Sequence, residues 1–177
     1  MSTASPATAP RLRILALLAA AVVAAVAAAG DDGMTHLHLY IHETVGASST
    51  TALLAGNNSS FGGVGAIDDE LREGSDPASQ YLGRAQGMLT HADLGSPTAS
   101  CAILSLAFTE GDYGGSTLVV DGRVDLGADG KAVVELAVVG GTGRFRRARG
   151  YSLVTKIGNP TPSTVVFEMD LYVKISG

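Results

Sequence analysis

The sequence predicts an all-β domain, a barrel or a sandwich, in the part of the chain that follows residue 30. Two segments, residues 35–43 and 164–175, alternate between apolar and polar side chains, as half-buried strands do. Shorter apolar runs between them are separated by turns rich in glycine or proline, and none of this part has a helical period. The 23 glycines and the absence of tryptophan also indicate a turn-rich β protein rather than a helical bundle.

The N-terminus predicts a secretory signal peptide. Arg11 and Arg13 precede a continuous apolar run over residues 14–29, which ends in small residues suited to cleavage before residue 30. A signal anchor is the alternative, but the apolar run is short for a membrane span and two aspartates end it. We therefore expect a leader over residues 1–29, a β-barrel domain over residues 30–177 and a secreted, extracellular protein.

The charge balance disfavours nucleic acid and anionic membranes as partners. The chain has 177 residues, enough for one ordinary domain, and a formal net charge of -5. Loss of the leader removes two arginines, so 10 basic residues would face 17 acidic ones, a net charge of about -7. A field of this sign repels phosphate.

Cys101 is the only cysteine, so the chain forms no internal disulfide and no multi-cysteine metal site. It lies in an apolar run, and we expect its thiol to be buried as a small hydrophobic group.

Asn57 and Asn58 begin two overlapping acceptor sequences for N-glycosylation in a polar loop. In a secreted chain we expect one of the two to be glycosylated, and the sequence does not choose between them.

The first predicted strand has one apolar and one polar face. The apolar face consists of Leu37, Leu39 and Ile41. The opposite face carries three histidines and a tyrosine: His36, His38, Tyr40 and His42. Two histidines at positions i and i+2 need a third ligand and a supporting shell to bind a metal, so we expect them in solvent or at a subunit interface and predict no metal site.

Carboxylates follow in two places where a strand could direct them inward. Glu43 has the parity of the apolar face, and burial in a cavity would raise its pKa and suit it to general acid catalysis near neutral pH. If the strand ends before Glu43, the side chain is instead solvated at the rim, and both readings stay open. Asp68 and Asp69 are adjacent, so at most one of them is expected to enter a cavity.

Four shorter apolar runs are also predicted as strands: residues 102–108, 117–121, 133–139 and 151–157. A Gly-Thr-Gly string at residues 141–143 is interpreted as a hairpin turn, because the third glycine of a dinucleotide-binding fingerprint and a following helical pattern are both missing. Four arginines between residues 144 and 149 are interpreted as a solvated strand edge.

Seven strings, taken in order, resemble the plant dirigent family and span nearly all of the chain beyond the leader. They are Leu-Tyr-Ile-His-Glu at 39–43, Ile-Asp-Asp at 67–69, Gly-Arg-Ala-Gln-Gly at 83–87, Tyr-Gly-Gly-Ser at 113–116, Val-Val-Gly-Gly-Thr-Gly-Arg-Phe-Arg at 138–146, Ala-Arg-Gly-Tyr at 148–151 and Glu-Met-Asp-Leu-Tyr-Val at 168–173. In detail the chain is similar to the grass members, some of which carry a C-terminal jacalin-like lectin domain, and it stops before any such domain.

The resemblance implies an eight-stranded antiparallel β-barrel, shared with the allene oxide cyclases, and a homo-oligomer that is usually a trimer, in the apoplast. It implies stereoselective coupling of phenoxy radicals from a monolignol such as coniferyl alcohol into an optically active lignan. A separate laccase or peroxidase would supply the radicals, and the barrel itself would need no cofactor. The physical task is to orient two fast-reacting partners rather than to lower a large barrier.

The resemblance also implies pocket residues, at four places. They are Glu43, Asp69, Tyr113 and one of Asp125 and Asp129, whereas Arg84 is expected to be structural and to pair with an acid in the barrel wall. The chain departs from the family pattern at Glu43, where the first motif normally ends in aspartate, and at Val134, where lignan-forming members carry a pocket arginine.

Three functions therefore remain open on the sequence. The first is stereodirected radical coupling. The second is an acid-assisted cyclisation or dehydration of a phenolic or oxylipin substrate on the same barrel, and the third is a defence-related module that only binds a phenolic or a glycan.

Overall fold

The computed structural model describes residues 33–56, 61–96, 99–127 and 129–175. The predicted leader and both candidate glycosylation sites, Asn57 and Asn58, lie outside these residues. Within them, no helix is long and apolar enough to cross a membrane.

In the described part of the chain, nine strands form one antiparallel sheet and two short 3-10 helices lie in its turns. The elements are β1 (Thr35–Thr44), β2 (Thr51–Ala55), β3 (Val64–Arg72), β4 (Tyr81–Thr90), β5 (Ser100–Phe108), η1 (Gly111–Tyr113), β6 (Thr117–Val124), β7 (Val134–Gly141), η2 (Gly143–Phe145), β8 (Arg149–Thr161) and β9 (Thr164–Lys174).

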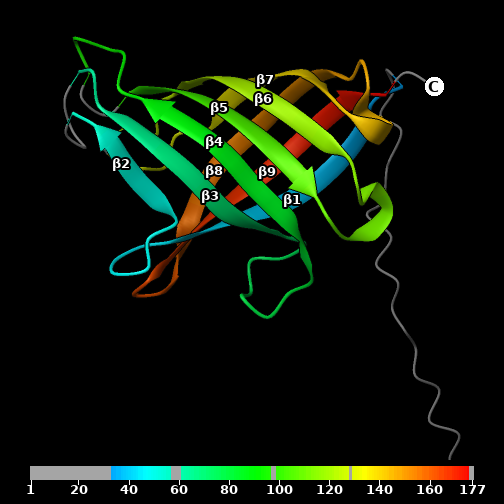
Figure 1. Cartoon of the computed structure of the whole chain (residues 1–177), viewed down its shortest axis with the longest axis horizontal. Coiled ribbons are helices and arrows are strands. Elements are labelled where there is room, and N and C mark those ends of the chain that lie inside the picture. Colours follow the sequence, from blue (N-terminus) through cyan, green and yellow to red (C-terminus); the bar gives the residue numbers. More distant parts are fainter. Residues whose placement is uncertain (1–32, 57–60, 97–98, 128, 176–177) are drawn as a thin grey trace, which may run out of the picture.

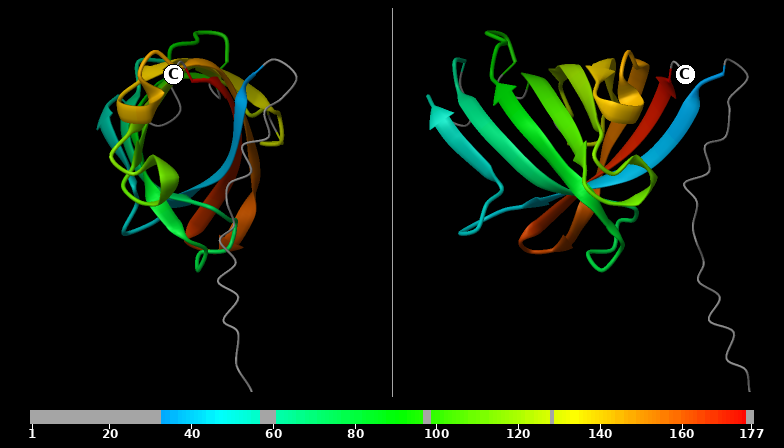
Figure 2. Two further views of the ribbon diagram at one scale, coloured as in Figure 1. Left: turned by 90° about the vertical axis from the view of Figure 1, so that its right-hand side faces the viewer. Right: turned by 45° about the vertical axis from the view of Figure 1, so that its right-hand side comes forward.

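The sheet closes into a barrel because β1 pairs on both sides, with β9 along its whole length and with β3 near its end. The contact with β3 joins residues 40–42 to residues 70–72. Strand β2 continues beside the other half of β3, so β1 and β3–β9 make a closed ring of eight strands (Figures 1 and 2). The predicted eight-stranded antiparallel barrel is confirmed.

One end of the barrel interior is filled. The inward residues predicted on β1, Leu37, Leu39 and Ile41, are at most 5% exposed. At the end that carries η1 and η2, the ring of Tyr113 stacks on the fully buried Phe145, with 4.9 Å between ring centres. Both rings contact Phe108, so this aromatic cluster closes that end.

Strands β2, β3 and β4 match none of the ranges that the sequence predicts as strands. In β4 two glycines and two long polar side chains interrupt the apolar alternation. The glycines are needed, because a Cβ atom at Gly83 or Gly87 would lie 1.9 Å from a carbonyl oxygen of β5. The motif Gly-Arg-Ala-Gln-Gly thus lets β4 and β5 approach closely.

The expectation that Cys101 is buried is wrong, because its side chain is exposed. In β5 the alternation turns Ser100 and Ala102 inward and Cys101 outward. Its neighbours across the sheet are Thr90 and Arg123.

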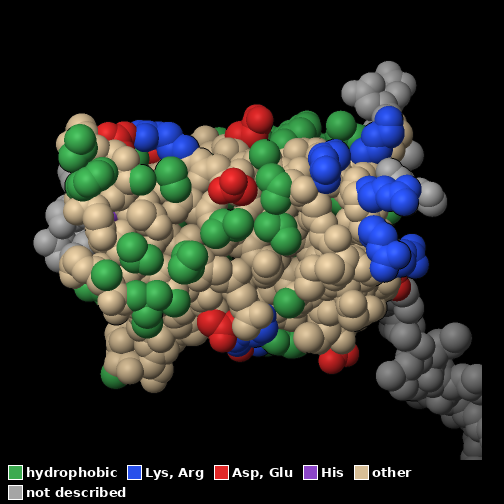
Figure 3. Space-filling view, turned by 45° about the horizontal axis from the view of Figure 1, so that its top comes forward, with side chains coloured by type: hydrophobic (Ala, Val, Ile, Leu, Met, Phe, Trp, Pro, Cys, Tyr) green, Lys and Arg blue, Asp and Glu red, His purple; other side chains and the backbone are tan. Residues whose placement is uncertain are grey.

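Basic side chains on the outer surface are concentrated at one end of the barrel. The four arginines predicted to be solvated are all exposed, and basic side chains gather at the end of the barrel that carries η2 (Figure 3). They are Arg144, Arg146, Arg147 and Arg149. Among the described residues, four large apolar side chains are between 44% and 47% exposed: Met88, Ile103, Val139 and Ile157.

The close approach of β4 to β5 predicts that Gly87→Ala lowers the free energy of unfolding by more than about 2 kcal/mol, because the new methyl group would overlap the Ile103 carbonyl. Gly65→Ala is the matched control, since its Cβ would lie 3.5 Å from its nearest neighbour and should change stability by about 0.5 kcal/mol or less. Denaturant unfolding of the two variants gives both values. Equal midpoints would show that the strands do not approach as closely as described.

Candidate functional site

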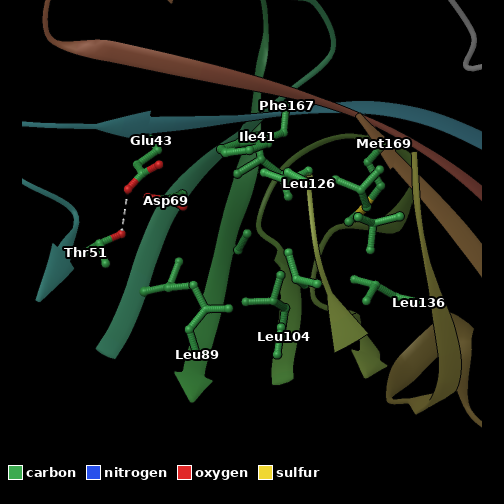
Figure 4. Close-up of a pocket in the computed structure, with 16 residues that line it drawn as sticks. Ile41, Glu43, Thr51, Asp69, Leu89, Leu104, Leu126, Leu136, Phe167 and Met169 are labelled. Atoms are coloured by element: carbon green, nitrogen blue, oxygen red, sulfur yellow. Dashed lines mark hydrogen bonds between the residues drawn. The ribbon is translucent and has the colours of Figure 1, made fainter. Parts of the chain in front are cut away.

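A cavity occupies the half of the barrel that the aromatic cluster leaves open. It offers about 110 Å³ to the centres of water-sized molecules, which is room for several waters at roughly 10–15 Å³ each. Its wall is almost entirely apolar and comes from all nine strands of the described chain and from the turn after β6 (Figure 4). Leu89, Leu104, Leu136, Phe167 and Met169 are among the side chains that point into it.

Two carboxylates, Glu43 and Asp69, lie at the same side of this apolar cavity (Figure 4). Of the two readings for Glu43, the structure supports the inward one. The strand β1 runs on to Thr44, so Glu43 keeps the inward parity of Ile41 and lines the cavity. Its carboxylate accepts a hydrogen bond of 2.9 Å from the hydroxyl of Thr51, the first residue of β2.

Asp69 is the more deeply buried acid, with 5% of its surface exposed. Burial raises the pKa of its carboxyl group from 3.8 to about 7, and the nearby charge of Glu43 adds to the rise. The hydroxyl of Thr50 donates a hydrogen bond of 2.5 Å to Asp69, and this bond lowers the pKa and so offsets part of the rise. Asp69 is therefore a carboxyl group that can both hold and release a proton near neutral pH.

Asp68 faces the opposite way, as the alternation of a strand requires. Arg84 donates a hydrogen bond of 2.9 Å from Nε to its carboxylate and a second to its backbone oxygen, and Gln86 donates a third. The hydrogen bond from Arg84 is the main cause that lowers the pKa of Asp68. The predicted structural pairing of Arg84 is confirmed, and it lies on the outer wall, away from the cavity.

The structure does not bring the other predicted pocket residues to this cavity. Tyr113 packs in the aromatic cluster between Phe108 and Phe145, where burial raises the pKa of its hydroxyl. Asp125 pairs with Arg123 at 3.0 Å, and Asp129 is exposed and accepts a hydrogen bond from the backbone of the turn. None of the three is among the cavity-lining residues in the described part of the chain.

Val134 does line the cavity, at the position where the family resemblance places an arginine in lignan-forming members. Its side chain is 5% exposed, so this part of the wall is apolar and uncharged. Among the described lining residues, the charged groups are the two acids, and no cation faces them from the wall.

Sequence reasoning missed the residues that hold the acids. Thr50 and Thr51 follow a turn after β1 and connect to both carboxylates, and the backbone carbonyl of Thr50 also accepts a hydrogen bond from Asp68. A pair of threonines in a loop is too common to be singled out. One sequence signal could have pointed to them: the two threonines follow Glu43 at a spacing that allows a turn to bring them back beside its side chain.

The burial of Asp69 predicts a pH-dependent stability that Asp69→Asn removes. Because the folded-state pKa is about 7 and the ordinary value is 3.8, the folded state binds this proton more tightly. The contribution of Asp69 to stability is full below about pH 4, declines between about pH 4 and 7, and is constant above. At about 1.4 kcal/mol per pH unit, the variant should be more stable than the wild type by up to about 4 kcal/mol at pH 8, and not at pH 4.

Urea unfolding at the two pH values measures this difference. Asp68→Asn is the control, because its carboxylate pairs on the outer wall and its loss should cost about 1 kcal/mol or less at pH 8. If Asp69→Asn and the wild type showed the same dependence on pH, the carboxyl group would not be buried as described.

Comparison with known proteins assigns the family. A family model described as "Dirigent-like protein" matches residues 34–174. Dirigent protein 1 of Arabidopsis thaliana is 36% identical over 81% of this chain and 84% of its own length, and pterocarpan synthase 1 of Glycine max is 34% identical over 81% and 80%. The solved structure of the pterocarpan synthase dirigent protein GePTS1 superposes with a TM-score of 0.73 at 33% identity, over 81% of this chain and 89% of that one. The eight-stranded barrel with its acid-bearing apolar cavity therefore belongs to the dirigent family.

Proposed function

We propose that this dirigent protein binds a phenolic substrate in the barrel cavity and directs the stereochemistry of an acid-assisted ring closure. The observation that carries the proposal is the placement of Asp69 beside Glu43 in an otherwise apolar cavity, with the pKa of Asp69 raised to about 7. An acid of this pKa donates and accepts protons well at neutral pH.

The apolar wall supports a phenolic ring as the ligand. Flat aromatic rings gain most from burial against leucine, methionine and phenylalanine side chains, while a few polar groups at one side fix their orientation. Here the two acids and Thr51 are those polar groups. A substrate with hydroxyl groups at one end would be held in a single orientation.

The reaction that fits the two acids is loss of water from a phenolic benzylic alcohol. Neutral Asp69 donates a proton to the benzylic hydroxyl, which leaves as water, and Glu43 takes the proton of the phenol as a quinone methide forms. A second hydroxyl of the same molecule then adds to the quinone methide carbon. Its proton returns to Asp69, and Glu43 gives its proton back to the phenolic oxygen. One water is lost in total and no oxidant is consumed.

Stereodirected radical coupling is the second candidate, and the long apolar wall favours it because that wall offers room to stack aromatic rings. In this reaction a laccase or peroxidase oxidises a monolignol, and the cavity fixes which faces of the two radicals meet. The apolar Val134 in place of an arginine supports the first candidate over this one. Relatives named as pterocarpan synthases, at 32% and 34% identity, also support the first.

Ring closure needs no oxidase, whereas radical coupling requires one. We expect turnover of phenolic benzylic alcohols without oxidant, beginning with those that can close to a pterocarpan. The rate should fall about tenfold per unit as the pH rises above 7, because the active form carries a proton on Asp69. Asp69→Asn and Glu43→Gln should each lower kcat by about 100-fold or more, and Asp68→Asn should not.

Chiral chromatography of the products reads out both candidates in one assay. Racemic product, or equal rates with and without protein, would overturn ring closure for the alcohols tested. In a parallel arm, laccase and coniferyl alcohol are combined with the protein, and an enantiomeric excess that scales with the protein would establish coupling instead. Saturable binding with no product in either arm would leave only a binding module.

The mature protein is proposed to be a secreted homo-oligomer, a trimer by its family. The partly exposed Met88, Ile103 and Val139 on the barrel wall support an interface between copies, since apolar side chains of this size gain from burial. We predict that protein secreted by plant cells begins at residue 30 and has three times the mass of one chain. N-terminal sequencing and light scattering on the same sample check this, and an uncleaved N-terminus or a monomer would contradict it.

A further inference from the structure

The outer face of β1 and β9 brings two histidines and a carboxylate together. In the antiparallel pair, His38 lies directly opposite Asp170, and His36 lies two residues before His38 on the same face. His36 Nε2 and His38 Nδ1 each lie 2.7 Å from the same oxygen, Oδ1 of Asp170. One nitrogen from each ring and the carboxylate oxygen all lie within 4.8 Å of one another.

These three side chains are partly exposed to solvent. Between 30% and 40% of each side chain is exposed, so an ion can reach them while the sheet holds their backbones in register.

A second layer of contacts orients both imidazole rings. The other nitrogen of His38, Nε2, lies 2.8 Å from the hydroxyl of Tyr40 and 3.3 Å from Oε1 of Glu168. With Nε2 protonated, His38 donates towards these oxygens and leaves Nδ1 free as a ligand. This carboxylate–histidine arrangement is the outer shell that fixes the tautomer in protein metal sites. The ring of His36 stacks on Tyr172, with 4.7 Å between ring centres and 13° between ring planes.

We propose that His36, His38 and Asp170 form a binding site for a divalent transition-metal ion, with zinc as the reference ion. Imidazole nitrogen and carboxylate oxygen are donors that suit zinc and copper rather than calcium or magnesium. Bonds of about 2.0–2.1 Å place tetrahedral ligands roughly 3.4 Å apart, so each nitrogen has to move less than about 1 Å from Asp170 to admit the ion. Three ligands leave the remaining position to water or to a further partner.

The site joins the first and last strands of the barrel. β1 and β9 are distant in sequence, and their pairing brings the N-terminal histidines to Asp170. An ion that binds the folded protein and not the unfolded chain stabilises the fold by mass action, so zinc should raise the Tm as its free concentration exceeds Kd.

Calorimetric titration of the purified mature protein with zinc chloride, free of any polyhistidine tag, tests the proposal. We expect saturation at one ion per chain. His38→Asn and Asp170→Asn should each weaken binding by more than tenfold. Glu168→Gln should weaken it by about 10–100-fold through the orientation of His38. His91→Asn is the matched control, because His91 hydrogen-bonds to Ser100 on a different part of the barrel, and it should bind zinc as the wild type does.

Copper(II) electron paramagnetic resonance identifies the ligands independently. The wild type should show hyperfine coupling to two imidazole nitrogens, and His36→Asn or His38→Asn should show coupling to one. Circular dichroism confirms that each variant is folded, and the result for either histidine variant is decisive. No saturable binding, or equal affinity in the wild type and in a folded histidine variant, would overturn the site.

Discussion

Closure of the sheet by the short contact between β1 and β3 is the constraint on which the rest of the structure depends. Only residues 40–42 and 70–72 make it, yet it converts an open sheet into a ring with no free edge at that point. The closed wall shields inward side chains such as Asp69 from bulk solvent. The raised pKa of Asp69 follows, because its main cause is burial and Asp69 immediately precedes the closing contact.

The size of the inward side chains decides where the barrel is solid and where it is hollow. Near η1 and η2, Phe108, Phe145 and Tyr113 fill the interior. On the other side, small residues such as Ala85 and Ala102 face inward at comparable positions of the sheet. An eight-stranded barrel has an interior just wide enough for side chains to fill, so smaller ones leave room for a ligand.

The sequence predicts the parts of this arrangement that depend on strand alternation. Its period places Leu37, Leu39 and Ile41 inside and identifies Asp68 and Asp69 as facing opposite ways, and the family resemblance supplies the number of strands. It cannot predict β4, where the close backbone approach at Gly83 and Gly87 has replaced an apolar pattern with glycine. The outward Cys101 is missed for a related reason, since an apolar run does not show which of its residues face the core.

The site itself is only half predictable, because cross-strand register is not a local property. Strand parity favours an inward Glu43 and shows only that Asp68 and Asp69 face opposite ways. The family resemblance implies Asp69, Tyr113 and one of Asp125 and Asp129, and of these only Asp69 lines the cavity. Thr50 and Thr51 reach the acids only because β2 folds back along β3. In the same way, His36 and His38 acquire Asp170 only through the pairing of β1 with β9.

The two ends of β1 show how a single strand can serve two unrelated chemistries. Its inward parity supplies Ile41 and Glu43 to the apolar cavity, where an ionised carboxylate is costly and where we propose proton transfer. Its outward parity supplies His36 and His38 to the outer surface, where both contact Asp170 and where we propose that an ion binds. A one-residue slip of β1 against β9 would reverse both faces at once. Register is therefore under two independent constraints, which is a physical reason for β1 to pair with β9 over all ten of its residues.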